Sequence, residues 1–290
     1  MKKTTLLLCL SFLFCSAMSR AQQAISEKGF MDKAEAGNQM VNGNKEGKWF
    51  EHLNKNKQPV SDTASPYYQL IFYKEGKPEG LVRQYYARGL AKGLPVTEIH
   101  YRNGVKNGMM KGYYENGKTG CETPYTDGLK NGLAVCHYSN GNLSAETQFR
   151  DDQKNGMKKE YGIKGDLKKE TVYEKDKKNG LEKEYYNGGL VKSEITYSND
   201  EENGSAKEYY ENGKLKIETT YAKGNKINVE KEYYETGILK SETPYEDDKI
   251  DGEQKEYDEK GHLKTLTLYT AGNKQLTSTY DERGNEIDVR

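Results

Sequence analysis

Residues 203–228 read NGSAKEYYENGKLKIETTYAKGNKIN, and residues 179–204 read NGLEKEYYNGGLVKSEITYSNDEENG, so the two stretches match position by position without a gap. The glycine near the start of each stretch recurs at a 24-residue spacing, at Gly108, Gly132, Gly156, Gly180 and Gly204, is replaced once by Asn228, and returns as Gly252. Self-similarity at a fixed period of roughly 20 to 50 residues is typical of repeat architectures. The sequence therefore predicts regular repeats over residues 108–274.

Each repeat has the same internal pattern when positions are counted from that glycine as position 0. Position 9 is always glycine, position 11 is mostly Leu or Val, and position 14 is mostly Glu. Position 5 holds Tyr113, His137, Tyr161, Tyr185, Tyr209, Tyr233 and Tyr257. Position 17 holds Tyr125, Phe149, Tyr173, Tyr197, Tyr221, Tyr245 and Tyr269. Aromatic residues between Gly-rich turns indicate strand, turn, strand, turn in each repeat.

The turns set the expected register. In Glu211-Asn212-Gly213 the glycine supplies a left-handed residue, which predicts a three-residue hairpin loop. The second connection, such as residues 126–132, is longer and ends on another Asn-Gly. With a three-residue loop, positions 5 and 11 face each other across the hairpin. Positions 1, 3, 5, 11, 13, 15 and 17 then lie on one side of the sheet, and positions 4, 12 and 14 lie on the other. A two-residue loop would instead place the position 6 tyrosines beside Leu, and the sequence leaves that register open.

These observations predict an all-β chain, an elongated single-layer antiparallel sheet of about ten tandem β-hairpins. Residues 43–107 are expected to be degenerate repeats with insertions, and residues 275–290 a C-terminal capping hairpin. Hydrophobic residues make up 33% and charged residues 31%, which alone would suggest disorder, but 24 Tyr can hold a thin sheet together.

The first residues resemble a targeting segment. Lys2 and Lys3 precede an apolar run from Leu6 to Phe14, and small residues at Ser19 and Ala21 predict a signal peptide over residues 1–21, cleaved after Ala21. Export to the periplasm, the cell envelope or the medium is therefore expected. Residues 22–42 show no repeat positions and are expected to be a mobile leader.

Charge and spacing argue against several classes of site. Removing residues 1–21 leaves 42 basic and 45 acidic residues, and such a balance disfavours nucleic acid and makes a membrane surface a weak candidate. The four histidines lie apart in the repeat, and the paired acids fall in turns without a calcium-loop pattern. We therefore expect no metal site, no cofactor, no catalytic residues and no enzymatic activity.

Two cysteines remain after processing, Cys121 at position 13 and Cys136 at position 4 of the next repeat. They lie on adjacent strands, so a disulfide is possible in an oxidising compartment. The preferred register points their side chains to opposite faces, which disfavours the bond. A bond between them would mean that this register is wrong by one residue.

The repeat resembles the bacterial variant of MORN repeats, in units such as Asn179-Gly180-Leu-Glu-Lys-Glu-Tyr185-Tyr186, over about residues 43–285. The resemblance implies an elongated single-layer antiparallel sheet of consecutive hairpins, a MORN-like repeat solenoid. Similar proteins are often labelled as an antitoxin family, and other MORN proteins act as scaffolds or lipid-contacting modules. The resemblance brings no catalytic residues.

The leading functional hypothesis is a protein-binding or scaffold module that uses a Tyr-rich sheet face; its oligomeric state is open. The alternatives are envelope polysaccharide binding, peripheral membrane binding, antitoxin-like neutralisation of a partner protein, and a ladder that only holds the sheet together. The candidate binding residues are Tyr113, Tyr125, Tyr161, Tyr173, Tyr185, Tyr197, Tyr209, Tyr221, Tyr233 and Tyr245.

Overall fold

The computed structural model describes residues 29–290, which form β-strands and one short 3-10 turn, η1 (Lys33–Glu35). The predicted signal peptide and residues 22–28 of the predicted leader lie outside this range. The chain divides into two units. The N-terminal unit consists of the chain up to Leu143 together with Phe149–Asp152, and the C-terminal unit consists of Ser144–Gln148 and Gln153–Arg290. Within residues 29–290, no helix has the length and apolar character needed to cross a membrane.

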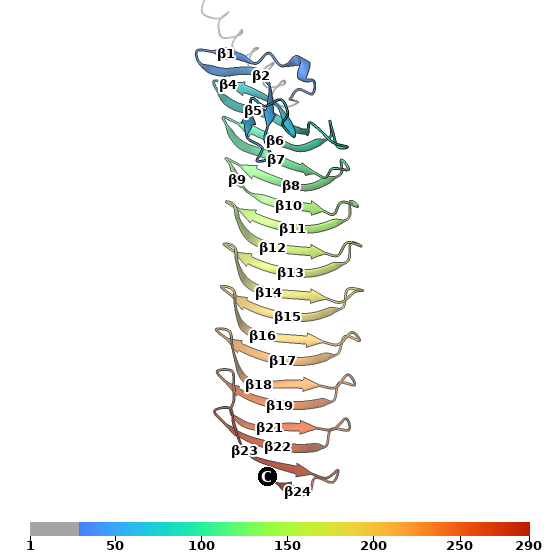
Figure 1. Cartoon of the computed structure of the whole chain (residues 1–290). Helices are drawn as coiled ribbons and strands as arrows, with labels where there is room; N and C mark the ends of the chain where they lie inside the picture. The colour runs from blue at the N-terminus through green and yellow to red at the C-terminus, as the bar shows by residue number, and fades with distance from the viewer. Residues whose placement is uncertain (1–28) are drawn as a thin grey trace, which may run out of the picture. The chain divides into compact units, whose positions relative to one another are not determined.

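The N-terminal unit is a series of antiparallel strands in which β1 pairs with β2, β2 with β4, and the longer strands then pair in chain order up to β8 and β10 (Figure 1). Its strands are β1 (Gln39–Val41), β2 (Asn44–Leu53), β3 (Pro59–Val60), β4 (Tyr67–Lys74), β5 (Lys77–Tyr86), β6 (Pro95–Arg102), β7 (Val105–Tyr113), β8 (Thr119–Thr126), β9 (Leu129–Lys130) and β10 (Gly132–His137). Strand β11 (Leu143–Arg150) is divided between the two units.

The first hairpins of this unit carry a hydrophobic core that the later repeats lack. Phe30, only 4% exposed, packs with Leu70 and Tyr85 in one cluster, and Ile71, Tyr73 and Val82 form another. The leader prediction is therefore corrected for residues 29–42, which contribute Phe30 to the core and β1 to the sheet. The physical reason is that the ring of Phe30 removes apolar surface of Leu70 and Tyr85 from water.

The C-terminal unit consists of antiparallel hairpins in chain order (Figure 1). Its strands are β12 (Gln153–Tyr161), β13 (Leu167–Glu174), β14 (Lys177–Tyr185), β15 (Val191–Ser198), β16 (Glu201–Tyr209), β17 (Leu215–Ala222), β18 (Asn225–Tyr233), β19 (Leu239–Glu246), β20 (Lys249–Ile250), β21 (Gly252–Tyr257), β22 (Leu263–Thr270), β23 (Asn273–Tyr280) and β24 (Glu286–Val289). The predicted all-β class built from antiparallel tandem hairpins is confirmed.

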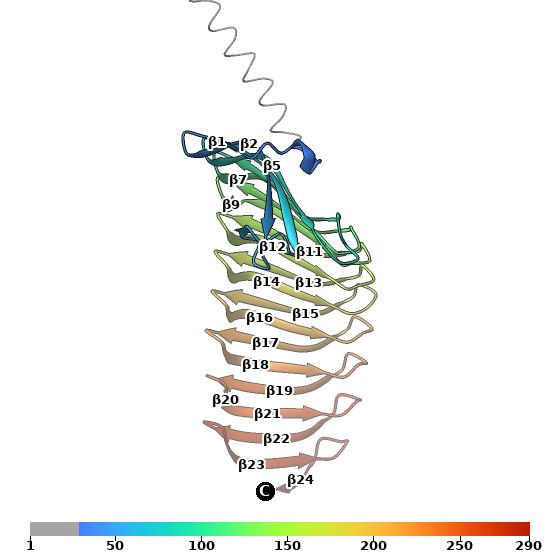
Figure 2. The same cartoon turned by 45° about the horizontal axis from the view of Figure 1, so that its top comes forward.

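The loop inside each hairpin of the C-terminal unit has the predicted length. Gly162 donates its N–H to the carbonyl of Asp166 at 2.7 Å, which leaves three residues in the loop, and Gly165 has a left-handed φ of 93°. Tyr161 at position 5 lies opposite Leu167 at position 11, as expected. Figure 2 shows these loops along one edge of the C-terminal unit and the other turns along the opposite edge.

The register changes immediately after this pair. Glu160 lies opposite Lys169, so Lys168 is an extra residue in β13, and the same shift recurs at Tyr185, Tyr209, Tyr233 and Tyr257. Because side chains alternate along a strand, one bulged residue exchanges the two faces for the rest of the strand. The predicted grouping of positions 5, 13, 15 and 17 on one face is therefore wrong: positions 13, 15 and 17 lie opposite positions 4, 2 and 0.

The second connection, which joins one hairpin to the next, is shorter than predicted. Glu174 pairs with Lys177, and Lys175 and Asp176 between them have φ of 51° and 67°, the two left-handed residues of a type I′ turn. Asn179-Gly180 is not part of this turn. Gly180 lies inside β14, where the register with β13 shifts and its φ is 123°.

Cys121 of β8 and Cys136 of β10 lie directly opposite each other and form a disulfide, with Cα atoms 4.0 Å apart. The sequence-based register disfavoured this bond. The correction has the same cause as the exchange of faces, because the bulge places positions 13 and 4 on one side of the sheet.

Candidate binding surfaces

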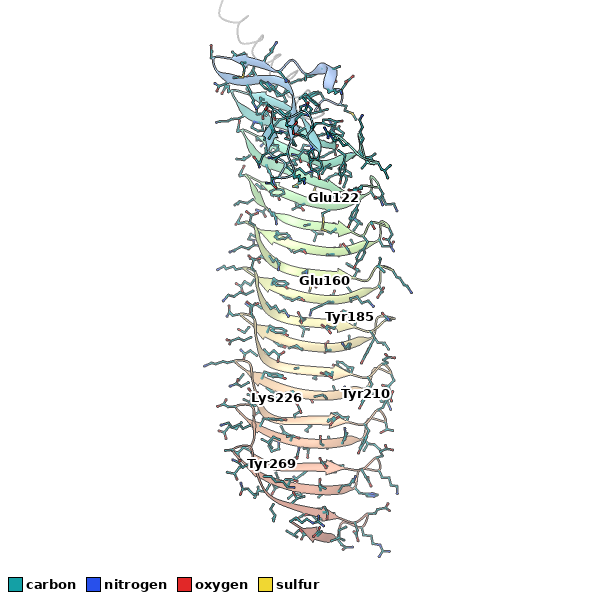
Figure 3. The ribbon with its side chains drawn as sticks, in the orientation of Figure 1. Glu122, Glu160, Tyr185, Tyr210, Lys226 and Tyr269 are labelled. Atoms are coloured by element: carbon teal, nitrogen blue, oxygen red, sulfur yellow. A yellow bond between two sulfur atoms is a disulfide. The ribbon has the colours of Figure 1, made fainter. Side chains whose placement is uncertain are left out.

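The ten candidate tyrosines do not form one surface. Those at position 5 lie on what we call the Tyr–Glu face, which consists of positions 1, 3, 5, 14 and 16. Those at position 17 lie on the opposite, Tyr–Lys face, which consists of positions 2, 13, 15, 17 and 22. In Figure 3, Tyr185 lies towards the hairpin-loop edge of the C-terminal unit, whereas Lys226 and Tyr269 lie towards the turn edge.

On the Tyr–Glu face, most position 5 hydroxyls form hydrogen bonds inside the sheet. Tyr185 donates to Glu170 of the preceding hairpin at 2.6 Å, and Lys159 lies 3.1 Å from the same carboxylate. Tyr161, Tyr209 and Tyr257 make the equivalent bonds to Glu146, Glu194 and Glu242. Burial and the neighbouring carboxylate raise the pKa of Tyr185 to about 12, and the hydrogen bond from Tyr185, with Lys159, lowers the pKa of Glu170. These tyrosines hold successive hairpins together.

The same face carries a row of exposed apolar side chains beside the Lys and Glu rows. In the C-terminal unit it comprises Met157, Leu181 and Val229 at position 1 and Leu268 at position 16, exposed by 41%, 38%, 44% and 39%. In the N-terminal unit, Met109 and Leu133 occupy position 1 and are also exposed. The apolar residues at position 1 can be recognised in the sequence, but the predicted binding residues were all tyrosines.

On the Tyr–Lys face, lysines cover the aromatic rings. The ammonium group at position 22 lies over the position 17 ring, with Lys154, Lys178 and Lys226 at 4.7, 4.4 and 5.0 Å from the ring centres of Tyr173, Tyr197 and Tyr245. Lys178 also reaches Glu182 at 2.8 Å, and Glu182 accepts a hydrogen bond from Thr171. Burial raises the pKa of Glu182, but the hydrogen bonds from Lys169, Lys178 and Thr171 outweigh it, so the pKa lies below its ordinary value.

The hairpin-loop edge has a third row of tyrosines, at position 6, which are not among the candidate binding residues predicted from the sequence. Tyr186, Tyr210 and Tyr234 each donate a hydrogen bond to the backbone carbonyl of the position 5 tyrosine in the next hairpin, at 2.7 to 2.8 Å. Figure 3 labels Tyr210 at this edge. These side chains link one loop to the next.

Aspartates at the second residue of the two-residue turns also connect neighbouring hairpins. Asp176 accepts a hydrogen bond from the N–H of Lys154 through its side chain and donates its own N–H to the carbonyl of Lys154. Asp200 and Asp248 repeat this pattern with Lys178 and Lys226. Among residues 29–290, no cluster of three or more His, Cys, Asp or Glu side chains could hold a metal ion.

A family model described as "MORN repeat variant" matches residues 178–199, 202–223, 227–247 and 250–271. Residues 178–271 therefore match variant MORN repeats. The four matched MORN repeats lie within the C-terminal unit, and each spans most of one 24-residue period. MORN repeats of this kind indicate a repeat protein that binds a protein or a membrane.

Other comparisons add little. None of the curated proteins matches this chain. Among solved structures, a chain from "Crystal Structure of TcdB2-TccC3-Cdc42" is similar over 81% of this chain, with 12% identity and a TM-score of 0.20. The similar region spans 14% of that chain, and a TM-score this low supports no argument about fold or function.

Proposed function

We propose that this protein is an exported, non-enzymatic binding module that recognises a partner protein through its Tyr–Glu face. The observation that supports the proposal most is the row of exposed apolar side chains at positions 1 and 16. Exposed apolar rows bordered by charged residues are typical of protein interfaces.

The chemistry of the two faces favours a protein over a polysaccharide. Sugar binding by stacking needs open aromatic rings, but several position 17 rings already have a lysine ammonium above them. On the Tyr–Glu face, by contrast, Met157 and Leu181 are exposed next to Lys159–Glu170 and Lys183–Glu194 ion pairs. Apolar contacts would provide affinity there, and the charge rows would provide orientation.

Two observations support export. The expected targeting segment is the first, and the Cys121–Cys136 disulfide is the second. Disulfides persist in oxidising compartments and are rare where thioredoxin and glutathione keep thiols reduced.

The test is a quantitative pull-down from the envelope and secreted fraction of the source organism, read by mass spectrometry. The variant Met157→Ser/Leu181→Ser/Val229→Ser removes the apolar row, and Tyr173→Ser/Tyr197→Ser/Tyr245→Ser alters the opposite face as a matched control. Circular dichroism first establishes that both variants fold. We expect one or more proteins to be retained by wild type and by the control and lost by the apolar-row variant.

Equal retention by all three chains would contradict the proposed surface. Loss by the Tyr–Lys variant alone would place the binding on the other face. Export is tested separately by N-terminal sequencing of the protein recovered from the envelope and secreted fractions, where a start at Gln22 is expected.

A further inference from the structure

The Tyr–Lys face departs from its lysine pattern at Tyr221 and Tyr269, where Glu202 and Ile250 occupy position 22. The residue that should cover the Tyr221 ring, by analogy with Lys178 over Tyr197 and Lys226 over Tyr245, is Glu202. A carboxylate therefore stands where neighbouring repeats place an ammonium group. In the described part of the chain, the contact recorded for the Glu202 side chain is a long hydrogen bond of 3.4 Å from the Tyr197 hydroxyl, and no lysine or arginine forms an ion pair with it.

Three further positions change around the same point. Ala206 at position 2 stands in line with Glu182 and Glu230, so no carboxylate fills this place. Ile195 lies directly opposite Ala206 and replaces the threonine found in neighbouring repeats as Thr171 and Thr219. Ile217 occupies position 13, where a preceding repeat has Lys169.

These changes leave a cavity of about 250 Å³ between β15, β16, β17 and β18. Ile195, Ala206, Ile217 and the Tyr221 ring give it apolar walls, and Glu202 and Glu230 provide carboxylates. Lys226 also lines the cavity, but its ammonium is held by Glu230 at 2.6 Å and lies over Tyr245. Figure 3 labels Lys226 towards the turn edge of the C-terminal unit.

We propose that this cavity binds an alkylammonium group, with the alkyl chain against the two isoleucines and the ammonium between Glu202 and the Tyr221 ring. The fold supplies a lysine ammonium at the rings of Tyr197 and Tyr245, whereas at Tyr221 it supplies an acid and empty space. A cation over a tyrosine ring is attracted by the ring's electron-rich face, and a carboxylate beside it adds to the attraction.

The ligand has the chemistry of a lysine side chain, a four-carbon stem that ends in an ammonium group. It could be supplied by a free aliphatic amine or by a lysine of a bound protein. This site lies on the face opposite the apolar row, so it does not depend on the proposed function.

The first experiment titrates the purified protein with n-butylammonium chloride, followed by saturation-transfer NMR and isothermal calorimetry, with n-butanol as the uncharged control probe. We expect the amine to bind, and the signal of the methylene next to its nitrogen to shift upfield because that group lies beside the Tyr221 ring. The key variant is Glu202→Lys, which restores the residue of neighbouring repeats and should occupy the site itself. It should weaken binding by about tenfold or more, which corresponds to about 1.4 kcal/mol.

The matched control is Glu201→Lys, which makes the same change of charge at the neighbouring, exposed residue and should leave binding unchanged. A second variant, Ala206→Glu, fills the cavity with the side chain found at Glu182 and should also weaken binding. The proposal is overturned if wild type does not bind the amine, if Glu202→Lys binds as well as wild type, or if Glu201→Lys loses binding to the same extent.

Competition then identifies the source of the amine. Displacement of butylammonium by a lysine-containing peptide, but not by the same peptide with its lysine acetylated, would assign the site to a protein lysine. Binding of butylammonium without displacement by the peptide would assign it to a free amine.

Discussion

At position 0 of the repeat, two separate demands select glycine. Gly180 has a φ of 123°, a backbone conformation that other residues rarely adopt. A Cβ atom at Gly180 would also lie 3.1 Å from the Cβ of Val172 on the neighbouring strand. Asn228 can occupy the same repeat position because its φ is 63°, within the left-handed region that Asn tolerates.

This comparison predicts that Gly180→Ala is more destabilising than Gly189→Ala. Gly189 also has a positive φ, of 89°, but nothing lies within 4 Å of the place where its Cβ would be. We expect Gly180→Ala to lower the free energy of unfolding by about 2 kcal/mol, and Gly189→Ala by less, in urea titrations followed by circular dichroism. Equal losses would show that the contact with Val172 costs nothing.

The Tyr185 hydroxyl is predicted to stabilise the link between two hairpins. Tyr185→Phe removes its 2.6 Å bond to Glu170 and should lower the free energy of unfolding by about 1 kcal/mol. Tyr197→Phe removes only a 3.4 Å bond and serves as the control, with a smaller effect in the same urea titration. If the two variants behave alike, the Tyr–Glu bonds do not carry the stability assigned to them.

At the scale of the element, the hairpin was largely predictable and the face of its second strand was not. The three-residue loop followed from the glycine at position 9, and the pairing of Tyr161 with Leu167 followed from the loop. The bulge at Lys168 could not be predicted from the sequence, because lysine fits equally well in a regular strand and in a bulge. The Asn179-Gly180 pair looked like a turn signal, whereas the turn is at Lys175-Asp176, where Lys is an unusual left-handed residue.

The rows of ionisable groups predict a stability that falls at both ends of the pH scale. Hydrogen bonds and ion pairs lower the pKa of Glu170 and Glu194 below 4.5, so their contribution is present above that pH and is lost as the pH falls further. The pKa of Tyr161 and Tyr185 is raised from 10.0 to about 12, so their contribution is present below pH 10 and is lost as the pH rises to about 12. Thermal unfolding from pH 2 to 12 should show a plateau between these limits. A stability maximum below pH 4 would contradict the assignment.

The disulfide is predicted to stabilise the N-terminal unit. Cys121 and Cys136 are 15 residues apart, and closing a loop of that length contributes about 3 kcal/mol by restricting the unfolded chain. Reduction should therefore lower the urea midpoint of unfolding, measured by the fluorescence of Trp49, the one tryptophan of the chain. The variant Cys121→Ser/Cys136→Ser is the control and should not respond to reductant. A wild-type midpoint unchanged by reductant would contradict the prediction.

At the scale of the whole molecule, regularity explains both what the sequence predicts and what it hides. The 24-residue period identifies the tandem hairpins because each repeat makes the same contacts to its neighbours. The sequence does not show which substitutions within the repeat lie together, because that depends on the register. Only the structure shows that Glu202 and Ala206 line the same cavity as Tyr221. The packing of Phe30 against Leu70 and Tyr85 was not predictable, because Phe30 lies outside the repeat and is distant from both residues in sequence.

The central claim is that one bulged residue per repeat places the two tyrosine rows on opposite faces, and both proposed sites depend on it. The most direct measurement replaces Lys169 and Glu184, a cross-strand pair equivalent to Cys121 and Cys136, with cysteines and maps disulfide-linked peptides by mass spectrometry after mild oxidation. Lys169→Cys with Lys183→Cys is the control, since Lys183 neighbours Glu184 in β14 but points to the other face. We expect a bond in the first variant and none in the control. A bond in the control and none in the first variant would contradict the bulged register.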